Sequence, residues 1–164
     1  MASTITPATL NVTVREQITM NGTDYGATTR YSADSITEVS RRIITTNGTA
    51  STEIIRFQPS ASAGQYINTD VRYVRITNLD DTNHATLRFL GSGTTDYAFR
   101  LDPETSHVLM TSQASGSATG PSGSVNTGLT SYADIRGVVL TNLRRISAIA
   151  SGSAVSLELF VASE

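Results

Sequence analysis

The 164-residue chain contains no cysteine, no lysine and no tryptophan. Without cysteine there are no disulfide bonds and no thiolate metal sites. Without lysine there is no Walker A phosphate loop, no Schiff-base lysine and no Ser-Lys dyad. All twelve basic residues are therefore arginine. Arginine is favoured at protein interfaces, where lysine is depleted, although a bias in genomic base composition produces the same pattern.

Charge and long apolar runs are also scarce. Only 16 % of the residues are charged, and the net charge is −2. Binding to nucleic-acid phosphates requires a surplus of basic side chains, so we expect no nucleic-acid partner. The N-terminus has no basic and apolar leader, and no apolar run reaches membrane-spanning length. We therefore expect a soluble protein with no membrane partner and no export signal.

The residues that are abundant favour β-structure. Serine and threonine together supply 45 residues and glycine 12, a composition typical of strands joined by many turns. Apolar residues alternate with polar ones at 10–14, 85–89 and 155–161, the period of a strand with one buried face. We predict an all-β protein, an antiparallel β-sandwich resembling a jelly roll, with about eight to ten strands and at most one short helix. A polar N-terminal arm at 1–9 would precede a single domain at 10–164.

Turn residues divide the strands. Asn-Gly at 21–22, Asn-Gly at 47–48 and Ser-Gly-Ser at 151–153 each predict a hairpin. Apolar residues flank the second of these, at Ile43, Ile44, Ile54, Ile55 and Phe57. The segment 34–44 leaves a second interpretation open. Its apolar spacing of three and four also fits a short helix capped by Asp34 or Ser35.

The chain contains an internal repeat. The sequence DVRYVRITNL at 70–79 returns as DIRGVVLTNL at 134–143, with six of ten positions identical. In each copy Thr-Asn-Leu closes an aliphatic strand, where asparagine commonly forms an Asx-turn. Either a sandwich with two related halves or the reuse of a few β-forming residues explains the repeat. Both explanations predict a β-sandwich.

Residues with catalytic potential are few and poorly spaced. The two histidines are His84 and His107, and the latter stands five residues after Asp102. This spacing alone does not indicate a Ser-His-Asp site, and the chain has no G-x-S-x-G elbow. Asp102 and Glu104 flank a proline, as turn residues commonly do, although glycosidases also use paired acids. We expect no enzyme activity and no cofactor.

A metal site is also weakly indicated. The stretch NLDDTNH at 78–84 is rich in oxygen ligands, but it lacks the spacing of a calcium loop. Whether its turn at Asp80 to Asn83 binds an ion is left open, and the prediction is a turn without metal. The segment 112–128 is rich in glycine and serine, but no lysine follows it, so it does not form a phosphate-binding loop.

Three segments carry a resemblance to a known group of proteins. The stretches YVRITNLDDTNHATLRFLG, FRLDPETSHVLM and ISAIASGSAVSLELFVA resemble the small structural proteins of tailed bacteriophage particles. The resemblance covers residues 65–111 and 132–162 and consists of strands and turns rather than a site motif. It implies a β-sandwich subunit present in many copies in the virion and assembled in the host cytoplasm.

Our expectation for function is a non-enzymatic virion protein. The first hypothesis is a capsid decoration or cement protein that stabilises the shell through contacts with the major capsid protein or other virion subunits. The alternative within the virion is a tail, neck or fibre-attachment subunit. A carbohydrate-binding module is the alternative from another class, but the absence of tryptophan deprives it of the usual aromatic platform. We also expect a closed homo-oligomer, with a trimer favoured.

Two polar segments are the predicted contact regions. The arm before residue 10 and the long loop 112–128 contain almost no apolar residues, so neither can join a core. We expect both to be flexible in the free protein and ordered by a partner. The candidate interface residues are Ser3, Thr4, Ile5, Thr6, Gly116, Gly120, Pro121, Gly123 and Asn126.

Deletion of residues 114–126 tests this interpretation of the loop. Because the loop brings one valine to any core, the thermal midpoint of the free protein should be almost unchanged, as differential scanning calorimetry can measure. Incorporation into particles should weaken. A deletion that unfolds the free subunit would place the loop in the core instead.

Overall fold

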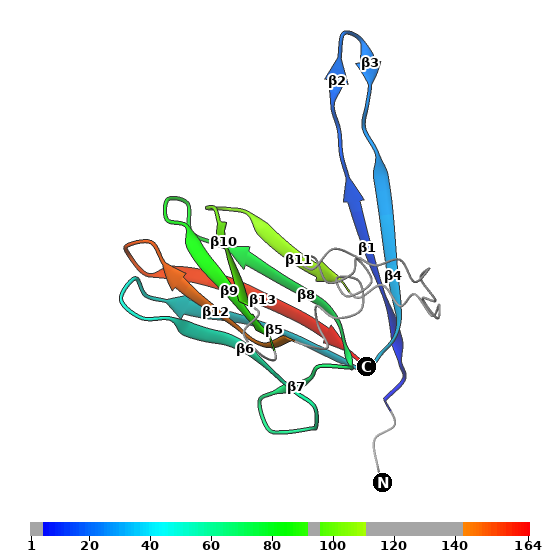
Figure 1. The fold of residues 1–164 in the computed structure, drawn as a ribbon. Helices are drawn as coiled ribbons and strands as arrows, with labels where there is room; N and C mark the ends of the chain where they lie inside the picture. The colour runs from blue at the N-terminus through cyan, green and yellow to red at the C-terminus, as the bar shows by residue number, and fades with distance from the viewer. Residues whose placement is uncertain (1–4, 92–95, 111–142) are drawn as a thin grey trace, which may run out of the picture.

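The computed structural model describes residues 5–91, 96–110 and 143–164. In these ranges all regular structure is β, and there is no helix. Two sheets lie face to face, and a long two-stranded ribbon projects from them (Figure 1). The predicted antiparallel all-β sandwich is confirmed.

The sandwich consists of nine strands, β5 to β13, within the number predicted. One sheet has the order β10-β9-β12-β6-β7 and the other the order β11-β8-β13-β5. Every neighbouring pair is antiparallel except β6 and β7, which are parallel. The strands are β5 (Glu38–Thr46), β6 (Thr52–Gln58), β7 (Tyr66–Ile67), β8 (Val71–Asn78), β9 (Ala85–Gly91), β10 (Asp96–Leu101), β11 (Ser106–Met110), β12 (Leu143–Ala150) and β13 (Val155–Ser163).

The ribbon, which the sequence did not predict as a separate unit, is formed by the first four strands. β1 (Ala8–Arg15) pairs with β4 (Thr28–Ile36), and β2 (Thr19–Met20) pairs with β3 (Thr23–Asp24) at its tip. Asn21 and Gly22 close the tip with φ values of 51° and 79°, so both adopt the left-handed conformation that a tight hairpin requires. The hairpin predicted at 21–22 is confirmed. From here on, the arm means residues 8–36, which is a different segment from the polar N-terminal arm predicted at 1–9. The distal arm means residues 14–29.

Alternate apolar side chains fill the core between the sheets, as the period-two pattern predicts. The central strands β8, β9, β12 and β13, together with β6, turn apolar side chains inward, and these side chains are buried. The largest buried core side chains are Phe57, Phe89, Ile54, Ile55, Ile76, Leu87, Ile146, Leu157 and Leu159.

Two of the predicted hairpins are wrong. β5 and β6, on either side of Asn47-Gly48, lie in different sheets, and so do β12 and β13 around residues 151–153. Each loop crosses between the sheets, and the strands that it joins face each other across the core. A crossing lets both strands bury their apolar rows against one another, whereas a hairpin would place them side by side in one sheet.

The two crossing loops pack together at one end of the sandwich. The amide of Ala150 donates to the carbonyl of Asn47 at 3.1 Å. A Cβ atom on Gly48 would lie 2.4 Å from the carbonyl oxygen of Gly152, so only glycine fits this close approach. A Cβ on Gly152 would meet only the side-chain oxygen of Asn83, at 3.9 Å.

The alternative helix at 34–44 is also wrong. This segment forms the end of β4 and most of β5. Ser35 has a φ of 61°, a left-handed conformation that no α-helix contains. The apolar spacing that suggested a helix belongs to two strands with a corner between them.

The first copy of the repeat forms β8, and Asn78 at its end fixes two loops. Its side-chain oxygen accepts from the Asp80 amide at 3.0 Å, the Asx-turn expected. Its side-chain amide donates to the carbonyls of Asn83, at 2.9 Å, and of Leu101, at 3.3 Å. The second copy, at 134–143, lies outside the described residues apart from Leu143, as does the predicted flexible loop at 112–128.

Substitution of the two glycines at the crossing loops tests their packing. Gly48→Ala should destabilise the protein by about 1–3 kcal/mol, because the added methyl group collides with the opposite backbone. Gly152→Ala, the matched control, should change stability by less than about 0.5 kcal/mol, since its methyl group meets only ordinary contacts. Urea unfolding followed by circular dichroism measures both. Equal effects of the two substitutions would contradict the packing described.

Candidate interaction surface

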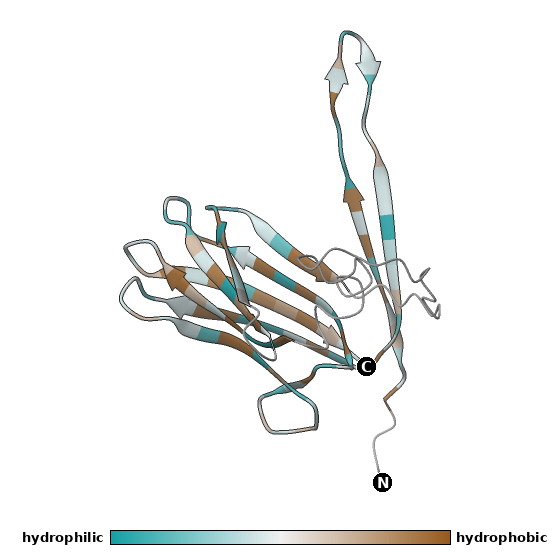
Figure 2. Ribbon diagram, in the orientation of Figure 1, coloured by the Kyte–Doolittle hydropathy of each residue, from teal (hydrophilic) through white to brown (hydrophobic). Residues whose placement is uncertain are grey.

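Apolar and polar residues alternate along the first strand of the arm (Figure 2). Along β1, residues 10, 12 and 14 share a face because successive side chains of a strand point in opposite directions. The apolar face consists of Leu10, Val12 and Val14 and their partners on β4, Ala33, Tyr31 and Thr29. The opposite face carries Thr13, Arg15 and Arg30. No charged side chain lies on the apolar face of the β1–β4 pair.

The base of the arm covers the outer face of the four-stranded sheet. Ala33 and Ile36 of the arm are buried in one cluster with Tyr73 of β8 and Ala162 of β13. The half-buried side chains packed against this cluster are Leu10, Val12, Tyr31, Val108 and Phe160. The rings of Tyr73 and Phe160 meet edge to face, with 5.8 Å between centroids. Burial of these apolar groups fixes the arm to the sandwich.

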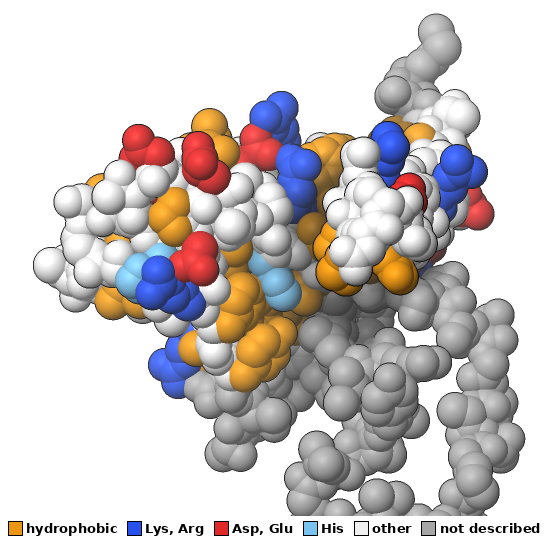
Figure 3. All heavy atoms as spheres, turned by 90° about the horizontal axis from the view of Figure 1, so that it is seen from above, with side chains coloured by type: hydrophobic (Ala, Val, Ile, Leu, Met, Phe, Trp, Pro, Cys, Tyr) orange, Lys and Arg blue, Asp and Glu red, His pale blue; other side chains and the backbone are white. Residues whose placement is uncertain are grey.

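The distal arm continues the apolar stripe beyond the sandwich. Val14, Ile18 and Met20 are 50 %, 53 % and 55 % exposed. Seen from its tip, the arm has hydrophobic side chains on one side and charged side chains mostly on the other (Figure 3). An isolated two-stranded ribbon is at best marginally stable in water. The distal arm therefore has the composition of a segment that another surface covers.

A second exposed apolar row lies on β5. Val39 and Ile43 are 58 % and 64 % exposed on the outer face of the sheet. Val39 lies opposite Ala162, which is completely buried beside the arm base, so the covered and uncovered areas are continuous. In the described part of the chain, β5 is also an edge strand, with one side unpaired in its sheet. The sequence predicted that Ile43 lies on a hairpin that contributes to the core. In the structure its side chain lies on the outer face of the four-stranded sheet, exposed to solvent.

An ionic cluster lies beside this row. Glu158 of β13 is only 6 % exposed and accepts from Arg41 of β5, whose Nε lies at 2.8 Å, and from Nη2 of Arg75 of β8, at 2.5 Å. The hydrogen bond from Arg41, supported by the charges of both arginines, lowers the pKa of Glu158. Arg75 also lies over the ring of Phe160, 5.7 Å from its centroid. The cluster ties three neighbouring strands together.

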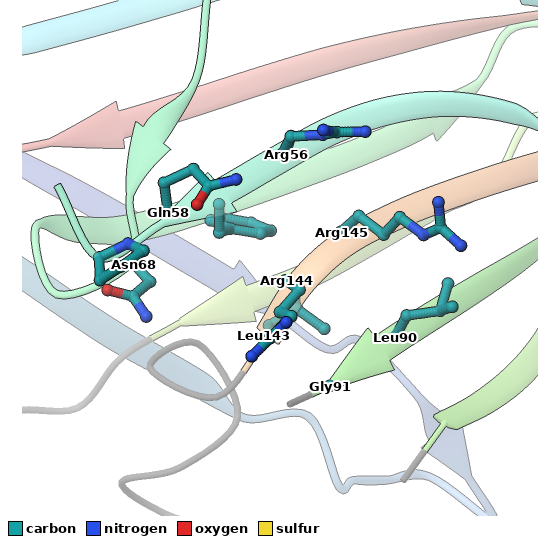
Figure 4. A pocket seen from close by; sticks show the side chains of 10 residues that line it. Arg56, Gln58, Asn68, Leu90, Gly91, Leu143, Arg144 and Arg145 are labelled. Atoms are coloured by element: carbon teal, nitrogen blue, oxygen red, sulfur yellow. The ribbon is translucent and has the colours of Figure 1, made fainter. Parts of the chain in front are cut away.

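An arginine-lined hollow of about 550 Å³ lies on the other sheet (Figure 4). Arg145 of β12 is directly opposite Arg56 of β6, and Arg144 lies beside it. Arg56 donates to Glu53 at 2.9 and 2.7 Å. The remaining lining residues are Phe57, Gln58, Pro59, Asn68, Leu90, Gly91 and Leu143. Such a lining can attract an oxyanion, but its described residues include no hydroxyl, imidazole or carboxylate group for acid-base or nucleophilic chemistry.

The structure separates the residues considered for a catalytic triad. The ring of His107 packs against Phe99 and Phe89, with centroid distances of 4.3 and 5.6 Å, and burial lowers its pKa. Asp102 instead accepts from Arg100 at 2.5 Å. The amide of Glu104 donates to the carbonyl of Asp80, so the proline segment is a turn that holds its neighbour in place.

The turn considered for an ion is closed by its own hydrogen bonds. One carboxylate oxygen of Asp80 accepts from the amides of Thr82, at 2.9 Å, and Asn83, at 2.5 Å. These bonds, the one from Asn83 foremost, lower the pKa of Asp80. Within the described ranges, no three His, Asp or Glu side chains are placed to hold a metal ion together.

Of the predicted interface residues, the structure describes two. Ile5 and Thr6 are described and exposed. Ser3, Thr4, Gly116, Gly120, Pro121, Gly123 and Asn126 lie outside the described residues. Sequence reasoning missed the exposed rows of the distal arm and β5, because alternation alone does not say whether an apolar row faces a core or solvent. The long alternation ending in Asn-Gly was the available signal for the arm.

Comparisons with known proteins give no relative. No family model, curated protein or solved structure matches this chain. In the part of the chain that the structure describes, no helix is long and apolar enough to cross a membrane.

Replacement of Glu158 tests the ionic cluster. Because folding lowers the pKa of Glu158, its contribution to stability is present above its ordinary pKa of about 4.3 and is lost as the pH falls through the lower folded value. Glu158→Gln should cost about 1–3 kcal/mol at pH 7, and the deficit should shrink in acid. Urea unfolding at several pH values measures it.

The control is Glu53→Gln on the surface of the other sheet. Glu53 also pairs with an arginine, but both side chains are partly exposed, so the cost should stay below about 1 kcal/mol. A deficit for Glu158→Gln that is the same at pH 7 and in acid would contradict the role of its charge.

Proposed function

We propose that this chain is a non-enzymatic structural subunit of a tailed-bacteriophage virion, and specifically a capsid decoration protein. It stabilises the shell through protein contacts made in part by the distal arm. The major capsid protein or another virion subunit is the partner. In this proposal the protein is assembled in the host cytoplasm and resides in the virion.

The projecting arm is the observation that carries the proposal. Val14, Ile18 and Met20 leave an apolar stripe in solvent on a ribbon that has no sheet behind it. Exposed apolar stripes of this kind mark protein interaction sites. In an assembled particle, contact with neighbouring subunits covers such a stripe.

The aromatic side chains favour protein contact over sugar binding. Tyr97 is 48 % exposed, but one face of its ring stacks on Phe89 with 4.6 Å between centroids. Tyr25 is exposed at the far tip of the arm. The two rings are on different elements, so the described residues offer no pair of neighbouring platforms for a sugar chain.

Shortening the arm tests the proposal. Deletion of residues 17–20 and 23–26 joins Glu16 and Ala27 through the existing Asn21-Gly22 turn and retains the hydrogen bond from Glu16 to Ala27. The sandwich should remain folded, because the base of the arm is unchanged. Binding to particles that lack the protein should fall about tenfold or more, as sedimentation with those particles measures.

A variant with Thr19→Ala serves as control, since it alters the tip on the face opposite Met20 and keeps the apolar stripe. Its binding should equal that of the natural chain. Electron microscopy of bound particles then distinguishes the shell from the tail or neck. Undiminished binding by the shortened arm, or label only at the tail, would contradict the decoration proposal.

A further inference from the structure

We propose that the distal arm of one copy lies on the β5 row of a second copy of this chain. This inference names the first partner of the arm and rests on the proposed role of the protein in assembly. The two surfaces that meet are Val14, Ile18 and Met20 on the arm and Val39 and Ile43 on β5.

The arm already binds this type of surface within its own chain. Leu10 and Val12, at the base of the stripe, pack on the outer face of β8 and β13 beside Phe160. The distal residues continue the same alternating row, in which Glu16 is the charged position between Val14 and Ile18. The outer row of β5 is the next row on the same face of the sheet, and the base of the arm leaves it bare. The exposed apolar side chains of the distal arm can therefore pack on the exposed apolar side chains of β5, as the base of the arm packs on β8 and β13.

Charge is compatible with the contact. The apolar face of the β1–β4 pair bears no charged side chain, and the distal row carries one, Glu16, between Val14 and Ile18. The one cation in the β5 row, Arg41, is paired with Glu158. Contact with an apolar stripe therefore leaves neither charge of this pair without its partner.

The same contact also protects an exposed edge. β5 has nine residues and, among the strands that the structure describes, no neighbour on one side of its sheet. A long edge strand with exposed apolar side chains is prone to uncontrolled pairing unless another element covers it. An arm from a neighbouring copy supplies that cover.

The geometry points to a closed assembly. The arm and the β5 row are different patches of one chain, so copies join either by reciprocal exchange in a dimer or around a ring. In both cases each arm reaches another copy, so light scattering of the free protein should give a whole multiple of the mass of the chain.

Cross-linking between marked copies tests the contact directly. Because the chain contains no cysteine, an introduced cysteine is the only thiol in its chain. Ile18→Cys and Ile43→Cys are placed in separate chains that differ in tag, mixed through reversible unfolding, and treated with a short bismaleimide. Heterodimers should form. Thr19→Cys, at the first residue of β2, whose side chain points away from the face that Met20 shares, should give about tenfold less product with the Ile43→Cys chain.

Polar substitutions give an independent measurement. Val39→Thr with Ile43→Thr retains β-branched residues on an exposed row, so the monomer should stay folded. The dissociation constant of the oligomer should rise about tenfold or more, because apolar contact is lost. Circular dichroism checks the fold, and sedimentation equilibrium measures association.

The outcomes separate this inference from the proposed function. A monomeric protein with no Ile18–Ile43 heterodimer, whether or not its arm is needed for particle binding, overturns the contact between copies and leaves the decoration proposal intact. Linking of positions 18 and 43 only within a doubly substituted chain also overturns it. A heterodimer from a protein that binds no particles supports the contact and contradicts the proposed function.

Discussion

Burial of β13 on both of its faces is the constraint on which the rest of the structure depends. Leu157 and Leu159 fill the core, while Ala162 is covered on the opposite face. A shift of one residue would move the core side chains outward and Glu158 inward, so the register of the strand is fixed. The register of β13 also sets how β5 and β8 pair with it. In this register Arg41 and Arg75 both reach the carboxylate of Glu158.

The sequence contains enough information for the strands, the sandwich and the local turns, because these depend on near neighbours. Alternation in 85–89 and 155–161 identifies buried rows correctly, and Asn78 makes the Asx-turn that its position predicts. Pairing between strands is a different matter. Asn47-Gly48 suits a hairpin or a crossing between sheets equally well, and the choice depends on contacts with Gly152, a hundred residues away.

The candidate site was the hardest part to predict, for a physical reason. An apolar row of side chains indicates that another surface covers it. The row does not indicate whether that surface belongs to the same chain. Ile43 and Ile44 are adjacent in sequence, yet one faces solvent and the other packs against the core. Leu10 and Ile18 belong to one alternating series. Leu10 packs against the sandwich, whereas Ile18 is exposed because the arm extends beyond the sandwich.

The order of strands also has a consequence for synthesis on the ribosome. β13 lies between β5 and β8, yet it leaves the ribosome after both of them. Neither earlier strand has its central neighbour until β13 emerges, so the four-stranded sheet cannot form before that point. Pairing across such long sequence separations is slow. The nascent chain therefore carries exposed apolar strands until β13 is made, and chaperones are the cellular factors that protect such strands.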